Sequence, residues 1–259
     1  MPVLGLGVWK TPAGAATIEA VRTALQAGYR LVDTATLYGN EKDVGQAIAS
    51  AGIPRDRLFV TTKVWNADQG FAPTLAAFER SHAALGGAPV DLYLIHWPVP
   101  ERRLETWKAL AQLYREGRCR AIGVSNFNVR HLEELLSVTD IVPAVNQVEF
   151  SPFLVQRGLL DYCRARGIQL EAYAPLTRGH RLDHPVIAGI ATSHGRSPAQ
   201  VVLRWALQHD VIVIPKTVRE ARMKENAGAL DFALPAAEMA QLDGLDEGYR
   251  TTTDPDTFA

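Results

Sequence analysis

The segment Leu58-Phe59-Val60-Thr61-Thr62-Lys63 is a short apolar and β-branched run that ends in a reactive side chain. Two further runs have the same form, because Tyr29–Val32 is followed by Asp33 and Leu92–Ile95 is followed by His96. Reactive side chains at the ends of successive strands are typical of a site on one rim of a parallel barrel. These runs therefore favour a parallel α/β fold with its chemistry at the carboxyl ends of the strands.

Eight runs of strand type occur along the chain, and longer segments with helical spacing separate them. We expect strands at Val3–Val8, Tyr29–Asp33, Leu58–Lys63, Asp91–Trp97, Ala121–Ser125, Ala144–Glu149, Ile168–Ala174 and Val211–Lys216. The segment with Ile18, Val21 and Leu25 is one example of helical spacing between them. A strand-helix unit repeated over this length matches a closed (β/α)8 TIM barrel better than an open sheet. An open doubly wound sheet stays as an alternative, although no G-x-G-x-x-G motif opens a first helix.

Extra helices are expected near the end of the chain. Pro185–Gly195 precedes Pro198–His209, and Pro235–Leu245 follows the last repeat unit. Ser197 before Pro198 is a favourable helix start, since serine caps the free N–H groups and proline lacks one. No linker rich in Pro, Gly or Ser divides the chain. The sequence therefore predicts a single barrel domain over residues 1–259, decorated by extra helices.

Composition and charge exclude several classes of function. The chain has 259 residues, of which 47% are hydrophobic, enough for one large core. Its 27 Lys and Arg nearly balance 28 Asp and Glu, so no net field attracts nucleic acid or an anionic membrane. The two cysteines, Cys119 and Cys163, are too few for a secreted disulfide framework and too far apart in sequence for a metal-ligand or redox pair. We expect a cytoplasmic protein without a metal site or a membrane span.

Tyr38 lies five residues after Asp33 and completes a chemically coherent set with Lys63 and His96. A phenol, a carboxylate, an ammonium and an imidazole can together deliver a proton to a carbonyl oxygen without a metal or a covalent nucleophile. A phenol is a weak acid at neutral pH, so we expect the Lys63 cation to lower the pKa of Tyr38. Taken singly, each residue also fits a rim ion pair, a packed ring or a core histidine. The consistent placement of all four favours catalysis.

Several spaced motifs run through nearly the whole chain: Asp33-Thr-Ala-x-x-Tyr38-x-Asn40-Glu41, Thr62-Lys63, Leu94-Ile95-His96-Trp97-Pro98 and Ile214-Pro215-Lys216-Thr217. In this order they resemble the aldo-keto reductase family. Val142-Pro143-Ala144-Val145-Asn146-Gln147 and Arg222-Met-Lys-Glu225-Asn226 are most similar to its bacterial branch with the 2,5-diketo-D-gluconate reductases. The resemblance implies a (β/α)8 barrel that binds NADPH and transfers its hydride to a small aldehyde or ketone, such as a keto-sugar, an α-dicarbonyl or an aromatic aldehyde.

The resemblance also implies roles for individual residues. Tyr38 is expected to be the general acid, Asp33 and Lys63 the pair that tunes it, and His96 the group that orients the carbonyl. The expected contacts to the nicotinamide carboxamide are Ser125, Asn126 and Gln147, and Tyr173 is the expected stacking partner of the ring. The expected substrate pocket consists of His96 and the tryptophans Trp9, Trp65 and Trp97.

The remaining expected cofactor contacts are Pro175, Leu176, Lys216, Thr217, Val218, Arg222, Glu225 and Asn226. Within this set, Lys216, Thr217 and Arg222 match the family positions that hold the adenosine 2′-phosphate, and Glu225 and Asn226 lie toward the adenine. Arginine offers a planar fork and lysine a point charge, and both suit a phosphate. This favours NADPH over NADH. A solvated basic helix start is the plain alternative for these cations.

The chain departs from the family pattern at four places. It begins without the family's N-terminal β-hairpin, so we expect part of the barrel floor to be exposed. Few residues separate Trp97 from a helix expected near Arg103, and the tail Gly248–Ala259 is short and polar, which together predict an open pocket. Thr177–Arg181 replaces the usual Gly-rich stretch after Leu176, so we expect a partly basic cover over the pyrophosphate.

Two other functions remain open at this stage. The same fold resembles potassium-channel β subunits, in which a nicotinamide cofactor serves as a signal. In a barrel aldolase or isomerase, Lys63 would instead form a Schiff base. The motif contexts favour the reductase, which we expect to act as a monomer.

Overall fold

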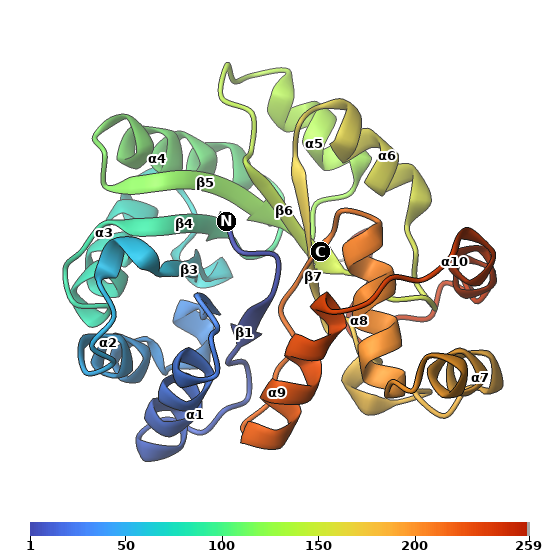
Figure 1. Ribbon diagram of the computed structural model, residues 1–259. Coiled ribbons are helices and arrows are strands. Elements are labelled where there is room, and N and C mark those ends of the chain that lie inside the picture. Colours follow the sequence, from blue (N-terminus) through green and yellow to red (C-terminus); the bar gives the residue numbers. More distant parts are fainter. Residues whose placement is uncertain (258–259) are drawn as a thin grey trace.

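Eight parallel strands form one barrel in the computed structural model, which describes residues 1–257 (Figure 1). They are β1 (Gly5–Gly7), β2 (Leu31–Asp33), β3 (Phe59–Val64), β4 (Val90–Ile95), β5 (Cys119–Ser125), β6 (Val145–Glu149), β7 (Gln169–Tyr173) and β8 (Ile212–Val213). Each strand pairs with the next in sequence. The parallel bridges Leu4–Val213 and Gly7–Lys216 join β8 to β1. The predicted (β/α)8 barrel is confirmed. Seven strands begin and end within two residues of the expected segments, and β8 ends three residues earlier than expected.

Helices surround the strands (Figure 1). Those that follow the barrel repeat are α1 (Ala15–Gln26), α2 (Glu41–Ala49), α3 (Phe71–Ala84), α4 (Arg103–Arg115), α5 (Val129–Leu136), α6 (Arg157–Ala165), α8 (Pro198–Gln208) and α9 (Glu220–Ala227). The expected extra helices are α7 (Pro185–His194) and α10 (Ala236–Asp243), and α7 packs against both α8 and α10. Ser197 accepts a hydrogen bond from the Gln200 amide at 3.3 Å, so it caps α8 as expected.

The alternation of side chains along each strand decides which groups enter the barrel. In β2, Val32 packs in the outer core, whereas Leu31 lies inside the barrel with Ile212 and Ile214. Because side chains alternate with a period of two, Asp33 points inward on the same face as Leu31. The same rule applies to every strand, so the inward residue at each carboxyl end faces one shared space.

Gly7 allows β1 and β8 to approach closely beside this space. A Cβ atom at position 7 would lie 2.9 Å from the carbonyl oxygen of Ile214, a contact that the backbone cannot relieve cheaply. The glycine thus belongs to the barrel closure and not to a phosphate-binding fingerprint.

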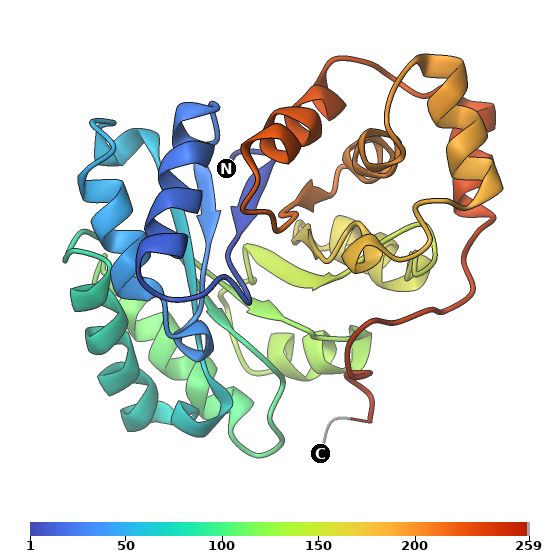
Figure 2. The ribbon, with the colours of Figure 1, turned by 90° about the horizontal axis from the view of Figure 1, so that it is seen from below.

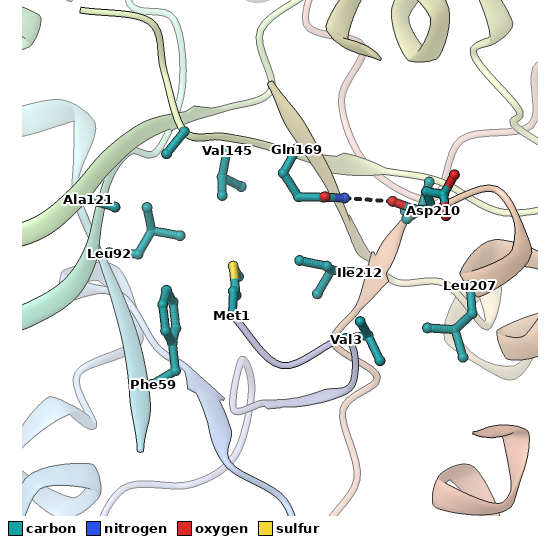
Figure 3. A pocket seen from close by; sticks show the side chains of 12 residues that line it. Met1, Val3, Phe59, Leu92, Ala121, Val145, Gln169, Leu207, Asp210 and Ile212 are labelled. Atoms are coloured by element: carbon teal, nitrogen blue, oxygen red, sulfur yellow. Dashed lines mark hydrogen bonds between the residues drawn. The ribbon is translucent and has the colours of Figure 1, made fainter. Parts of the chain in front are cut away.

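The opposite end of the barrel contains an apolar cavity of about 410 Å³. Figure 3 shows Met1 among Phe59, Leu92, Val145 and Ile212, whose side chains point into it. Residues 1–4 cross this end of the barrel, and Met1 and Val3 line the cavity there. In Figure 2 the N-terminus lies in the upper half of the view, and the red segment that follows the last helix descends toward the bottom. The predicted tail extends two residues beyond the described part, which ends at position 257.

Candidate active site

A buried ion pair lies at the carboxyl ends of β2 and β3. Lys63 Nζ donates to Asp33 Oδ1 at 2.6 Å, to Asp33 Oδ2 at 2.8 Å and to the carbonyl oxygen of Thr34 at 2.9 Å. The exposed fractions of the Lys63 and Asp33 side chains are 0% and 2%. All three ammonium hydrogens can therefore be satisfied, which makes burial of this charge tolerable.

Tyr38 lies at the end of a short 3-10 helix, η1 (Thr36–Tyr38), directly after β2. Thr36 Oγ1 donates to the carbonyl oxygen of Lys63 at 3.0 Å and ties this turn to β3. Behind it, the buried Asn40 accepts a hydrogen bond from Thr34 Oγ1 at 2.8 Å. These contacts hold the Tyr38 ring so that Lys63 Nζ lies 5.2 Å from its centroid.

His96 follows β4 and faces Tyr38 across the rim. The two ring centroids are 5.7 Å apart at an interplanar angle of 78°. Burial, and then the Lys63 charge, hold the pKa of His96 well below its usual range, so the imidazole is neutral at physiological pH. A neutral imidazole carries one N–H and can donate one hydrogen bond to a carbonyl oxygen.

The pKa of Tyr38 differs from the sequence expectation. Burial raises it, Lys63 lowers it in part, and the net result is a pKa of about 12 instead of a value below 10. Lys63 has the expected lowering effect, but the larger effect of desolvating the phenolate cannot be judged from the presence of a neighbouring lysine. Lys63 keeps its charge: burial lowers its pKa, but Asp33 and Tyr38 more than compensate, and the pKa lies above the ordinary value.

A cavity of about 740 Å³ opens above these residues. It is lined by every expected cofactor residue, namely Ser125, Asn126, Gln147, Tyr173, Pro175, Leu176, Lys216, Thr217, Val218, Arg222, Glu225 and Asn226. Asp33, Tyr38 and His96 lie at the same cavity, as do Trp9 and Trp97. Trp65 is not among the lining residues, and it contacts the His96 ring edge-on at a centroid distance of 5.1 Å. Trp65 therefore packs against the imidazole of His96.

Polar groups at the ends of β5, β6 and β7 are held by a hydrogen-bond network. Asn126 Nδ2 donates to the carbonyl oxygen of His96 at 2.9 Å, and Tyr173 donates through its hydroxyl to Asn126 Oδ1 at 2.7 Å. Ser125 Oγ donates to the carbonyl oxygen of Gln147 at 2.8 Å. This network fixes an amide, a hydroxyl and an aromatic ring side by side on one wall of the cavity.

Cations also line this cavity, on the segments that follow β1 and β7 and near the start of α9. They are Lys10, Arg178, Lys216, Arg219 and Arg222. The Arg178 guanidinium lies 4.9 Å from the Trp9 ring centroid, within the range of a cation–π contact. Arg178, which follows β7, and Trp9, which follows β1, therefore meet at the cavity.

Sequence reasoning missed Thr252 in the C-terminal tail. This residue lines the cavity and lies 3.0 Å from the Tyr173 hydroxyl through its own Oγ1. The buried Glu149 at the end of β6 accepts hydrogen bonds from the backbone amides of Thr251 and Thr252 at 2.7 and 3.2 Å, which ties the tail to the barrel. Nothing in a short polar tail identifies which of its residues returns to the site.

The comparisons with known proteins agree with this geometry. A family model described as the aldo/keto reductase family matches residues 3–247. The chain belongs to the aldo/keto reductase family. A glyoxal reductase of Bacillus subtilis is 51% identical over 256 residues, which cover 99% of this chain and 93% of that protein. A morphine 6-dehydrogenase of Pseudomonas putida is 47% identical over 270 residues, which cover 98% of this chain and 91% of that protein.

A solved structure has the same fold. The crystal structure of a Gox0644 mutant in complex with NADPH has a TM-score of 0.95 and 44% sequence identity, and the match covers 100% of this chain and 95% of that one. Within the described part of our chain, no helix is long and apolar enough to cross a membrane.

The state of Lys63 argues against an aldolase or isomerase with a Schiff-base lysine. Such a lysine must lose its proton to attack a carbonyl group, whereas Lys63 is protonated and donates its hydrogens to Asp33 and Thr34.

Proposed function

We propose that this protein is an NADPH-dependent aldo-keto reductase that reduces the carbonyl group of small aldehydes or ketones to an alcohol. One observation carries the proposal. Tyr38 and His96 face each other at the cavity, and the Lys63–Asp33 ion pair lies beneath them. This arrangement offers two hydrogen-bond donors to one carbonyl oxygen and a fixed positive charge close to the phenol.

The cavity suits NADPH in its chemistry. The proposed nicotinamide contacts are Ser125, Asn126, Gln147 and Tyr173, which combine amide and hydroxyl groups with an aromatic face. The proposed 2′-phosphate contacts are Lys216, Thr217 and Arg222. Pro175, Leu176, Val218, Glu225 and Asn226 complete the lining, the last two toward the adenine. Two cations around one phosphate favour NADPH over NADH.

When bound, NADPH supplies the hydride that adds to the carbonyl carbon. His96, neutral because its pKa is low, donates through its N–H and orients the carbonyl oxygen. As the C=O electron pair moves to that oxygen, Tyr38 transfers its hydroxyl proton to the developing alkoxide. An alkoxide is far more basic than a phenolate, so this transfer stays favourable even with a Tyr38 pKa of about 12. Lys63 stabilises the resulting phenolate, and solvent later returns a proton to Tyr38.

The aromatic wall formed by Trp9 and Trp97 suits apolar, planar or ring-shaped carbonyl compounds. The glyoxal reductase relative supports α-dicarbonyls as one substrate class, and we keep aromatic aldehydes and keto-sugars as further candidates. Loss of NADPH absorbance with phenylglyoxal, methylglyoxal, nitrobenzaldehyde and a diketo-sugar acid tests the proposal. We expect turnover with at least one of them and a clear preference for NADPH over NADH. Tight NADPH binding without turnover of any compound would instead support a cofactor-sensing role.

We further propose that one barrel domain works as a monomer in the cytoplasm. Cys119 and Cys163 are both buried and unpaired, which fits a reducing compartment. Light scattering during size-exclusion chromatography should give the mass of one chain, and the mass of two chains would contradict the monomer.

A further inference from the structure

Glu171 is a buried acid inside the barrel that the proposed reaction leaves without a role. It lies on β7, where its backbone is in register with Gln147 of β6. Its position two residues before Tyr173 places it on the same inward face of the strand. Its side chain is fully buried.

The Gln147 amide lies between two carboxyl groups. Gln147 Nε2 is 2.7 Å from Glu171 Oε2 and 2.8 Å from Asp33 Oδ2. Asp33 is ion-paired with Lys63 and its oxygens accept hydrogen bonds, so the atom between the two acids must be the amide nitrogen. Both hydrogens of that NH2 group are then used. The amide oxygen, Oε1, is the atom that Gln147 has left for a ligand in the cavity.

Asp33 alone would leave this amide free to turn. One hydrogen bond permits rotation about its own axis, whereas two acceptors on the two N–H groups fix the amide plane. Without Glu171, one buried N–H would have no acceptor, and Oε1 would swing away from its place at the cavity wall. The two acids therefore have different effects on the Gln147 amide. Asp33 determines that the amide nitrogen faces the ion pair, and Glu171 fixes the orientation of the amide plane.

We propose, on the basis of the proposed function, that Glu171 is a positioning residue for the cofactor. It fixes the Gln147 amide so that Oε1 accepts a hydrogen bond from the NH2 of the nicotinamide carboxamide. The site thereby recognises that NH2 group specifically, and not only the flat ring beside it.

The charged and titratable groups around Glu171 are Asp33 on β2, Tyr38 on η1 and Lys63 on β3. Burial and the Asp33 charge raise the pKa of Glu171 to about 8, so the carboxyl group holds a proton at neutral pH. Oε2 remains an acceptor in that state. The positioning role therefore needs the oxygen and not a negative charge, which makes glutamine a close substitute and leucine a disruptive one of similar size.

The test uses two probes that differ at one group. They are NADP+ and its 3-acetylpyridine analogue, in which a methyl group replaces the amide NH2, and binding is followed by calorimetry. The wild type should bind NADP+ roughly three- to tenfold more tightly than the analogue, the size of one hydrogen bond. Glu171→Leu should reduce this ratio to about one, and Glu171→Gln should keep it. Adenosine 2′,5′-bisphosphate, which lacks the nicotinamide, should bind all three proteins equally.

Four results would overturn the proposal. The first is a wild type that does not distinguish the two probes, and the second is a Glu171→Leu variant with the wild-type ratio. The third is equal weakening of all three ligands by that variant, because it would indicate general structural damage. The fourth is loss of the affinity ratio in Glu171→Gln, because it would assign the effect to the charge of Glu171 and not to its oxygen atom. This result can be measured even if Glu171→Leu does not fold. Failure of the wild type to bind both NADP+ and the bisphosphate would refute the proposed function itself.

Discussion

Replacing Lys63 with methionine tests how much the buried Lys63–Asp33 ion pair contributes to the free energy of unfolding. The exposed fractions of Lys63 and Asp33 are 0% and 2%, and Lys63 gives Asp33 two hydrogen bonds at 2.6 and 2.8 Å. Lys63→Met would leave a buried carboxylate whose one remaining side-chain donor is Gln147. Stranding one partner of a buried pair costs about 3–5 kcal/mol. We expect that loss in the free energy of unfolding, and Asp33→Asn should lose a similar amount because it strands the ammonium.

The double variant Asp33→Asn/Lys63→Met separates charge from packing. It removes both charges, so it should be more stable than either single variant, whereas independent contributions would add to about 6–10 kcal/mol. Urea unfolding near neutral pH without cofactor measures all three. Lys108→Met is a matched control, because the Lys108–Glu105 pair has exposed fractions of 61% and 50% and should change stability by less than about 1 kcal/mol. A Lys63→Met loss below about 1 kcal/mol, or a double variant whose loss equals the sum of the two single losses, would contradict a strong coupling between the two buried charges.

Three further predictions concern the cofactor and pH. Arg222→Ala should raise the Kd for NADPH about tenfold and leave that for NADH unchanged, since it removes a charge-assisted contact to the 2′-phosphate; equal effects on both would contradict this. Arg178→Ala should weaken NADPH binding roughly threefold because it removes the contact across Trp9, and an unchanged Kd would count against the basic cover. Folding raises the pKa of Glu171 from 4.5 to about 8, so the native state binds more protons and wild-type stability falls as pH rises between these values. Glu171→Gln should abolish that fall, of at most about 1.4 kcal/mol per pH unit, and parallel unfolding curves for both proteins across this range would argue against it.

Much of the fold was predictable because local patterns and the global architecture agree. Tyr29–Asp33 was expected as a strand and β2 is Leu31–Asp33, so the inward direction of Asp33 follows from alternation alone. The last strand was overestimated: Val211–Lys216 was expected, but β8 covers only Ile212–Val213. Pro215 has no N–H to donate, so the backbone hydrogen-bond ladder of β8 cannot continue through this residue. The extra helices were found from capping and proline signals that act locally.

The limits of prediction lie where three-dimensional surroundings decide a residue's chemistry. The net pKa of Tyr38 depends on burial, which spacing does not reveal, although the lowering effect of Lys63 was expected. Trp65 lies on the expected rim of the barrel, where it packs against the His96 ring, but it is not among the residues that line the cavity. Glu171 looks like an ordinary acid in a strand, and only its register with Gln147 reveals the shared amide. Thr252 reaches the site through Glu149, a partner more than 100 residues away.

The most direct test of the account is the rate of hydride transfer in Tyr38→Phe. The change removes one oxygen atom and keeps the ring packed beside His96 and Lys63. Single-turnover reduction of a carbonyl substrate should slow by about 10²–10⁴-fold, the usual contribution of a general acid, while the Kd for NADPH stays unchanged. Reduction at the wild-type rate with NADPH bound normally would contradict the assignment of Tyr38 and with it the proposed mechanism.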